Sequence, residues 1–225
     1  MNTNKNLAKI LGICFTASFL CYGIGNSLID AVLDSSNPLS IIKENKTSFV
    51  FGLILMAIIH TVFNTILAVI MLQFLKIRNK IIAHIYFTLV IVATIMLIIG
   101  AVFLFLILPL GDVYKISIHK YYLETLTIVC KNGNFYAYQI GMSIWAIAGL
   151  LFCYLLNKLK LVPNLFVIWG MTGYTIFIVG CLLELFGYNI GVWLSIPGGL
   201  FEIGLSIWLI IKGFKTSLNI KTNVR

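Results

Sequence analysis

The residues that could do chemistry here are polar side chains inside otherwise apolar segments. His60 and Asn64 are four residues apart in one such segment, and Glu202 lies in the last of them. A charged side chain at the centre of a bilayer costs at least about 2.5–3.5 kcal/mol on insertion scales, so each one needs a partner or a purpose. His60 and Glu202 are each roughly a dozen residues from the outer end of their segment. At ~1.5 Å per residue both are expected near the midplane of a membrane.

Helix-breaking residues directly precede Glu202. The segment 195–199 reads Ser-Ile-Pro-Gly-Gly. Proline removes a backbone donor and clashes with the preceding turn, so we expect a kink at Pro197, Gly198 and Gly199. Two interpretations stay open. The break could line a binding site, as interrupted helices do in transporters, or it could be a packing kink that lets a neighbouring helix approach closely.

These positions together predict a polar pocket formed by His60, Asn64, Ser195 and Glu202. Because His60 and Glu202 match in depth, we expect them to interact across two helices, in a charge state that the sequence leaves open. If they do not interact, Glu202 needs another partner. The next candidates are Asn26, Gln139 and the backbone freed by Pro197.

Known catalytic and metal-binding motifs are missing from the sequence. It contains no HExxH, GxSxG, P-loop or GxGxxG pattern. Its five cysteines form no CxxC motif and no Cys/His cluster, so no metal site is predicted. We therefore predict no cofactor and no catalytic residue, and an enzyme is the least favoured class.

The composition identifies the elements that must position the polar residues. Hydrophobic residues make up 60% of the 225, charged residues 10%, and the mean hydropathy is +1.04. A soluble domain averages about 45–50% apolar and about 25% charged residues. This chain has too little polar surface to face water all round, so a lipid bilayer must cover it. A soluble domain and a disordered chain are excluded.

Six apolar segments are each long enough for the roughly 20 residues that a spanning helix needs. Backbone groups in hydrocarbon must be satisfied within each segment, so the segments are helices. The sequence predicts an all-α, integral membrane six-helix bundle, with helix 6 kinked and residues 1–225 forming one domain. The expected spans are about 7–33, 49–75, 81–110, 136–156, 164–187 and 190–214.

The distribution of basic residues predicts the orientation. With the N-terminus inside, the inner segments hold eleven Lys and Arg residues and the outer segments hold five. Both termini are therefore expected in the cytoplasm, after an uncleaved first helix. The formal charge of +9 is mainly a topology signal, so no nucleic-acid partner is predicted. The largest outer loop, Gly111–Phe135, is expected to be either a short interfacial helix or disordered.

The last two helices resemble a known family. The stretch from Leu161-Val162-Pro163 to Leu183-Glu184-Leu185-Phe186-Gly187 resembles a hairpin of domain-of-unknown-function family 4386. The continuation Ile196-Pro197-Gly198-Gly199-Leu200-Phe201-Glu202, followed by Trp208-Leu209-Ile210-Ile211-Lys212-Gly213-Phe214, is similar to its closing motif. The resemblance implies the fold, a membrane location and a bacterial source, and it implies no activity.

The sequence therefore supports two classes of function. The leading hypothesis is a multi-pass protein of the bacterial cytoplasmic membrane that binds or transports a small molecule or ion at the predicted pocket. The alternative is an accessory or structural protein that stabilises a membrane-protein partner or a second copy of itself. A cavity between helices 2 and 6 would favour the first, and a filled bundle with an exposed face of small residues would favour the second.

Overall fold

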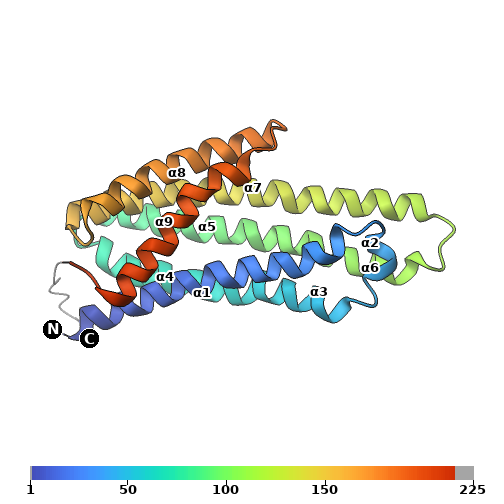
Figure 1. Ribbon diagram of the computed structural model, residues 1–225, viewed down its shortest axis with the longest axis horizontal. Coiled ribbons are helices and arrows are strands. Elements are labelled where there is room, and N and C mark those ends of the chain that lie inside the picture. Colours follow the sequence, from blue (N-terminus) through green and yellow to red (C-terminus); the bar gives the residue numbers. More distant parts are fainter. Residues whose placement is uncertain (1, 216–225) are drawn as a thin grey trace. The chain divides into compact units, whose positions relative to one another are not determined.

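The computed structural model describes residues 2–215, and every regular element in that range is a helix. This confirms the predicted all-helical class. The elements are α1 (Asn2–Leu33), α2 (Pro38–Ile41), α3 (Lys46–Leu53), the π-helix η1 (Ile54–Ile59), α4 (His60–Leu75), α5 (Lys80–Phe105), α6 (Ile107–Tyr114), α7 (Lys120–Leu159), α8 (Asn164–Leu185) and α9 (Gly191–Ile211) (Figure 1).

Six helices in this range are long and apolar enough to cross a membrane, as predicted. Several short elements join end to end, so that α3, η1 and α4 form one such segment and α5 and α6 form another. The six segments are Lys5–Leu33, Lys46–Leu75, Lys80–Tyr114, Lys120–Leu159, Asn164–Leu185 and Trp193–Ile211.

Of the two expectations for Gly111–Phe135, a disordered loop is wrong, because most of this segment is helical and its second part continues into the fourth apolar helix. α6 carries the third segment on to Tyr114, and the fourth helix already begins at Lys120. The early turns of α7 are helical because they have a core to pack on, which includes Leu123 and Cys130. Lys131 is also fixed, since its Nζ donates to the carbonyl oxygen of Leu33 at 3.1 Å.

Two local features depart from a plain α-helix. α9 stays helical from Gly191 to Ile211 with Pro197 inside it, so the segment is not unwound, and the predicted kink stays a prediction. The second apolar segment contains η1, a π-helical stretch that ends at Ile59 immediately before His60. Short π-helical stretches are rare and occur frequently at functional sites.

The chain divides into two compact units. Unit 1 contains residues 1–16, 64–93 and 142–225, and unit 2 contains residues 17–63 and 94–141. In unit 2, α2, α3 and α6 pack on the second half of α1 and the first part of α7. Its largest fully buried side chains include Ile29, Leu39, Ile42, Phe49, Leu53 and Met56.

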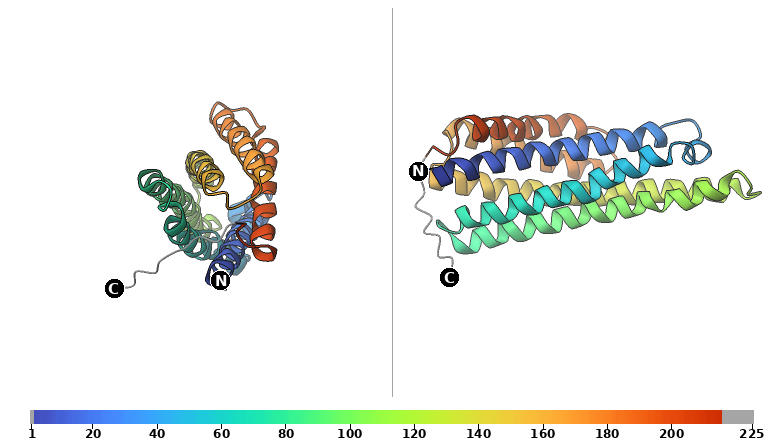
Figure 2. Two further views of the ribbon diagram at one scale, coloured as in Figure 1. Left: turned by 90° about the vertical axis from the view of Figure 1, so that its left-hand side faces the viewer. Right: turned by 90° about the horizontal axis from the view of Figure 1, so that it is seen from below.

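Unit 1 holds the α8–α9 hairpin, whose two helices pack together in all three views (Figures 1 and 2). Aromatic rings form much of its core. The Tyr174 and Phe201 ring centroids are 5.6 Å apart, and the Tyr86 and Phe152 centroids are 5.8 Å apart. Tyr174 in α8 and Phe201 in α9 are both fully buried, so these rings bury the neighbourhood of Glu202.

Candidate functional site

The carboxylate of Glu202, in unit 1, accepts hydrogen bonds from two aromatic side chains. Trp145 in α7 donates its indole N–H to Oε1 at 2.8 Å, and Tyr174 in α8 donates its hydroxyl to the same oxygen at 2.8 Å. Three helices therefore meet at one carboxylate oxygen. Two donors on one oxygen restrict the orientation of the Glu202 side chain.

The second oxygen of the carboxylate is in a different situation. Both hydrogen bonds described above go to Oε1 of Glu202, so the two oxygens of the carboxylate are not equivalent. The Glu202 residue as a whole is partly buried. A carboxylate oxygen of this kind can accept a proton, a hydrogen-bond donor or a cation.

The surroundings of the carboxylate are aromatic and tightly packed. Phe15, Tyr86 and Phe152 form one wall, with Phe152 6.1 Å from Phe15 between ring centroids. A small cavity lies among these rings, beside the two donors of Glu202. Its volume is about 10 Å³, which is close to the minimum that holds one water molecule. Trp145 and Tyr174 line this cavity, and Glu202 is not among its lining residues.

The Pro197 segment contacts α8 directly. Trp169 of α8 donates its indole N–H to the carbonyl oxygen of Pro197 at 3.1 Å. A Cβ atom added to Gly173 would lie 3.1 Å from the backbone of Pro197 and Gly198, so the two helices touch through their main chains here. The close approach of the two helices at this point depends on Gly173.

His60 lies in unit 2, where it is 6% exposed. Its ring meets Tyr22 of α1 edge-on at a centroid distance of 5.2 Å, and Tyr22 in turn stacks on Tyr138 at 5.9 Å. His60 thus belongs to an aromatic cluster formed by α1, α4 and α7. Asn64, which is 2% exposed, and Ser195 belong to unit 1 with Glu202.

Sequence reasoning found Glu202 and missed the two residues that bind it. The polar residues predicted to lie at depth carry charged, amide or hydroxyl side chains, and neither Trp145 nor Tyr174 is among them. Tyr and Trp are the aromatic residues that carry a hydrogen-bond donor, and that donor usually finds a partner when buried. A Trp or Tyr in an apolar segment, at the depth expected for Glu202, is therefore the sequence feature that could have identified its hydrogen-bond donors.

The described residues contain no group of three or more His, Cys, Asp or Glu side chains that could hold a metal ion.

Comparison with known proteins identifies one family. The model of the family described as "Domain of unknown function (DUF4386)" matches residues 10–213. This confirms the resemblance drawn from the last two helices and extends it over nearly the whole chain. Neither the curated proteins nor the solved structures give a match.

Proposed function

We propose that this chain, which belongs to the DUF4386 family, binds a small cation at Glu202. The description of that family names no activity, so the proposal depends on the chain's own residues. In this proposal it is a multi-pass protein of the bacterial cytoplasmic membrane with both termini inside. Transport of the bound cation would be a further step, for which uptake into proteoliposomes is the assay.

The observation that carries the proposal is the asymmetry of the Glu202 carboxylate. Trp145 and Tyr174 both bond to Oε1, which orients the group, and the proposed cation binds at Oε2. Fixing the carboxylate in advance reduces the ordering that binding would otherwise require. The neighbouring rings add to this, because aromatic faces attract cations. The cavity of about 10 Å³ beside its two donors leaves little space for a large organic molecule next to the carboxylate.

The remaining predicted pocket residues enter the proposal with different weights. Asn64 and Ser195 share unit 1 with Glu202 and are proposed as further oxygen ligands. His60 is proposed to couple with Glu202, which is tested separately by a double-mutant cycle. The single residue on which the proposal depends is Glu202.

Tryptophan emission provides the test, since the indole of Trp145 is bonded to the carboxylate. The purified protein in nanodiscs is titrated with sodium, potassium and tetramethylammonium chloride, with ionic strength held constant by N-methylglucamine chloride. We expect a saturable emission change with at least one of these cations. Trp145→Phe should remove most of the signal, and Glu202→Gln should remove the saturation.

Asp112→Asn is the matched control, because it removes an exposed carboxylate from unit 2. This variant should titrate like the native protein. The proposal fails if none of the three cations changes the emission, or if Glu202→Gln and Asp112→Asn behave alike.

The contact between α8 and α9 favours a second candidate, an accessory membrane protein whose polar residues only join helices. Gly173 and Pro197 would then serve rigid packing, and Glu202 would serve as a shared acceptor. The substitution Pro197→Ala with Gly198→Ala separates the two functions. If the break is needed for a pocket, the double variant unfolds at a higher temperature and binds the cation more weakly. If the double variant unfolds at a lower temperature, the Pro197 segment stabilises the packing of α9 on α8, and the accessory role is favoured.

A further inference from the structure

The net charge of the protein belongs entirely to unit 1. Unit 1 contains eleven of the sixteen Lys and Arg residues but only two acidic residues, Glu184 and Glu202. Unit 2 contains the other five basic residues and five acidic ones, so its formal charge is zero. The charge of +9 is therefore concentrated where few carboxylates can neutralise it.

Several helix ends that carry these charges meet at one end of unit 1. A Cβ on Gly213, just after α9, would lie 3.6 Å from Cγ of Lys5 in α1. The backbone N–H of Lys215 donates to the carbonyl oxygen of Leu161 at 2.7 Å, which joins the chain after α9 to the α7–α8 turn. Phe214 packs on Phe74, near the end of α4, at 4.9 Å between ring centroids. Figure 1 shows these ends together on its left-hand side.

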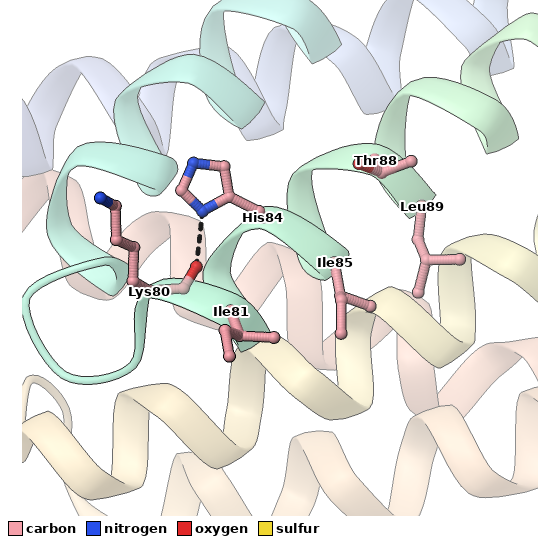
Figure 3. A pocket seen from close by; sticks show the side chains of 6 residues that line it. All are labelled: Lys80, Ile81, His84, Ile85, Thr88 and Leu89. Carbon is pink, nitrogen blue, oxygen red and sulfur yellow. Dashed lines mark hydrogen bonds between the residues drawn. The ribbon is translucent and has the colours of Figure 1, made fainter.

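A shallow groove of about 500 Å³ begins at this basic end and follows α5. Figure 3 shows its lining, with Lys80, Ile81 and His84 at the start of α5 and Ile85, Thr88 and Leu89 further along the helix. The ammonium of Lys80 and the ring of His84 lie at the start of the helix. The rest of the lining is largely apolar, and Ile81 is 74% exposed. The six lining residues are Lys80, Ile81, His84, Ile85, Thr88 and Leu89.

The length of the groove matches one leaflet of a bilayer. Lys80 begins the third membrane-spanning segment, and Leu89 lies nine residues further on. At ~1.5 Å per residue this distance is about 13 Å, close to half of a hydrocarbon core about 30 Å thick. The groove thus extends from the polar boundary of the segment to near the bilayer centre.

The polar end of the groove is fixed in place and surrounded by positive charge. Nδ1 of His84 donates to the carbonyl oxygen of Lys80 at 2.5 Å, which ties the ring to the first turn of α5 (Figure 3). In that tautomer Nε2 is free to accept a proton donor such as a hydroxyl. Lys76 and Arg78 lie exposed in the preceding turn. Residues 76–89 contain no acidic residue that could compete for these cations.

We propose that this groove binds one anionic phospholipid, with its phosphate at Lys80 and an acyl chain along Ile81, Ile85 and Leu89. A hydroxyl of the headgroup would donate to Nε2 of His84. Basic sites at the ends of membrane helices recognise anionic headgroups, at about 1 kcal/mol for each Lys or Arg near the surface. A free phosphate ion could use Lys80 but would leave the apolar part of the groove empty. The proposal is independent of cation binding at Glu202.

Native mass spectrometry of the full chain tests the proposal directly. The protein is purified in detergent and titrated with phosphatidylglycerol or, separately, with phosphatidylcholine. We expect one phosphatidylglycerol to bind more tightly than the others, and phosphatidylcholine to bind with no such preference. Lys80→Gln should weaken the first phosphatidylglycerol about fivefold, which corresponds to the loss of one surface cation.

Lys158→Gln is the matched control, since Lys158 is also exposed and belongs to unit 1 but does not line the groove. It should leave the first lipid in place. Thr88→Trp, which fills the groove without changing its charge, should weaken the lipid as Lys80→Gln does. The groove is not a lipid site if both lysine variants lose affinity equally, because that result indicates diffuse attraction to the basic end. Displacement of the lipid by millimolar glycerol phosphate would assign Lys80 to a free anion.

Discussion

Gly173 of α8 lies against Gly198 of α9, and a Cβ added to Gly173 would come within 3.1 Å of both Cα and N of Gly198. The converse addition is easy, because a Cβ on Gly198 would meet its nearest neighbour, the carbonyl oxygen of Gly173, at 3.6 Å. The two glycines therefore face one another without being equivalent. Only the one in α8 is required to lack a side chain.

Gly173→Ala is expected to lower the unfolding temperature in detergent, and Gly198→Ala is expected to raise it or leave it unchanged. Alanine favours a helix over glycine by about 1 kcal/mol at either position. At Gly173 that gain is opposed by overpacking, which costs roughly 1–3 kcal/mol, because the atoms in the way belong to the backbone. Thermal unfolding of the two variants side by side measures the difference. Equal stabilisation of both would mean that α8 and α9 separate without cost.

Glu184 is predicted to stabilise the start of α9. Its Oε1 accepts the backbone N–H of Gly191, the first residue of that helix, at 2.6 Å. A carboxylate at a helix N-terminus contributes about 0.3–1 kcal/mol, so Glu184→Gln should lose an amount in that range and speed hydrogen exchange at the first amides of α9. Glu44→Gln is the control. The exposed ion pair of Glu44 with Lys115 contributes little to stability, so Glu44→Gln should leave exchange at α9 unchanged. The capping role is refuted if Glu44→Gln speeds exchange at the first amides of α9 and Glu184→Gln does not.

The helices were predictable from sequence because long apolar runs allow few alternatives in lipid. The failure at residues 111–135 has a physical cause. Polar residues such as Lys120 and Glu124 lower the local hydropathy, yet Glu124 is bonded by the hydroxyl of Tyr114, and the helix continues through them. Tertiary contacts of this kind cannot be read from a window of sequence.

The site was only partly predictable for a related reason. The cost of a charge in hydrocarbon identified Glu202, whatever its neighbours were. Its partners depend on how α7 and α8 are rotated about their axes, which a nearly uniform apolar surface does not specify. Pro197 illustrates the same limit. The sequence left a ligand-lining break and a packing kink open, and only the contact with Gly173 shows close packing at that point.

Cysteine labelling is expected to give the sidedness that the basic residues predict. In a cysteine-free background, single cysteines in the turns should react from outside when placed at Lys43, Lys120 and Asn189. Those placed at Arg78, Lys158 and Lys221 should react only from inside. The first five positions are exposed, and Lys221 lies outside the described residues. Opposite sidedness at any two positions would overturn the orientation with both termini in the cytoplasm.

A double-mutant cycle on Tyr174→Phe and Glu202→Gln should reveal a shared energy, because the two side chains are bonded at 2.8 Å. Interhelical polar contacts in membranes average about 0.6 kcal/mol and reach about 1.7, so we expect a coupling of about 1 kcal/mol in the unfolding free energy. The cycle isolates this contribution from the cost of each single substitution. Trp145→Phe with Glu202→Gln should give a similar value, since Trp145 bonds to the same oxygen.

The cycle on His60→Ala and Glu202→Ala then tests the pairing that the sequence predicts. A coupling clearly different from zero would support interaction between the two residues, although the aromatic contact of His60 is with Tyr22 and the hydrogen bonds of Glu202 come from Trp145 and Tyr174. A value of zero, measured beside a positive one for Tyr174 and Glu202, would remove His60 from the site. The cation proposal would then depend on Glu202 and its two aromatic donors alone.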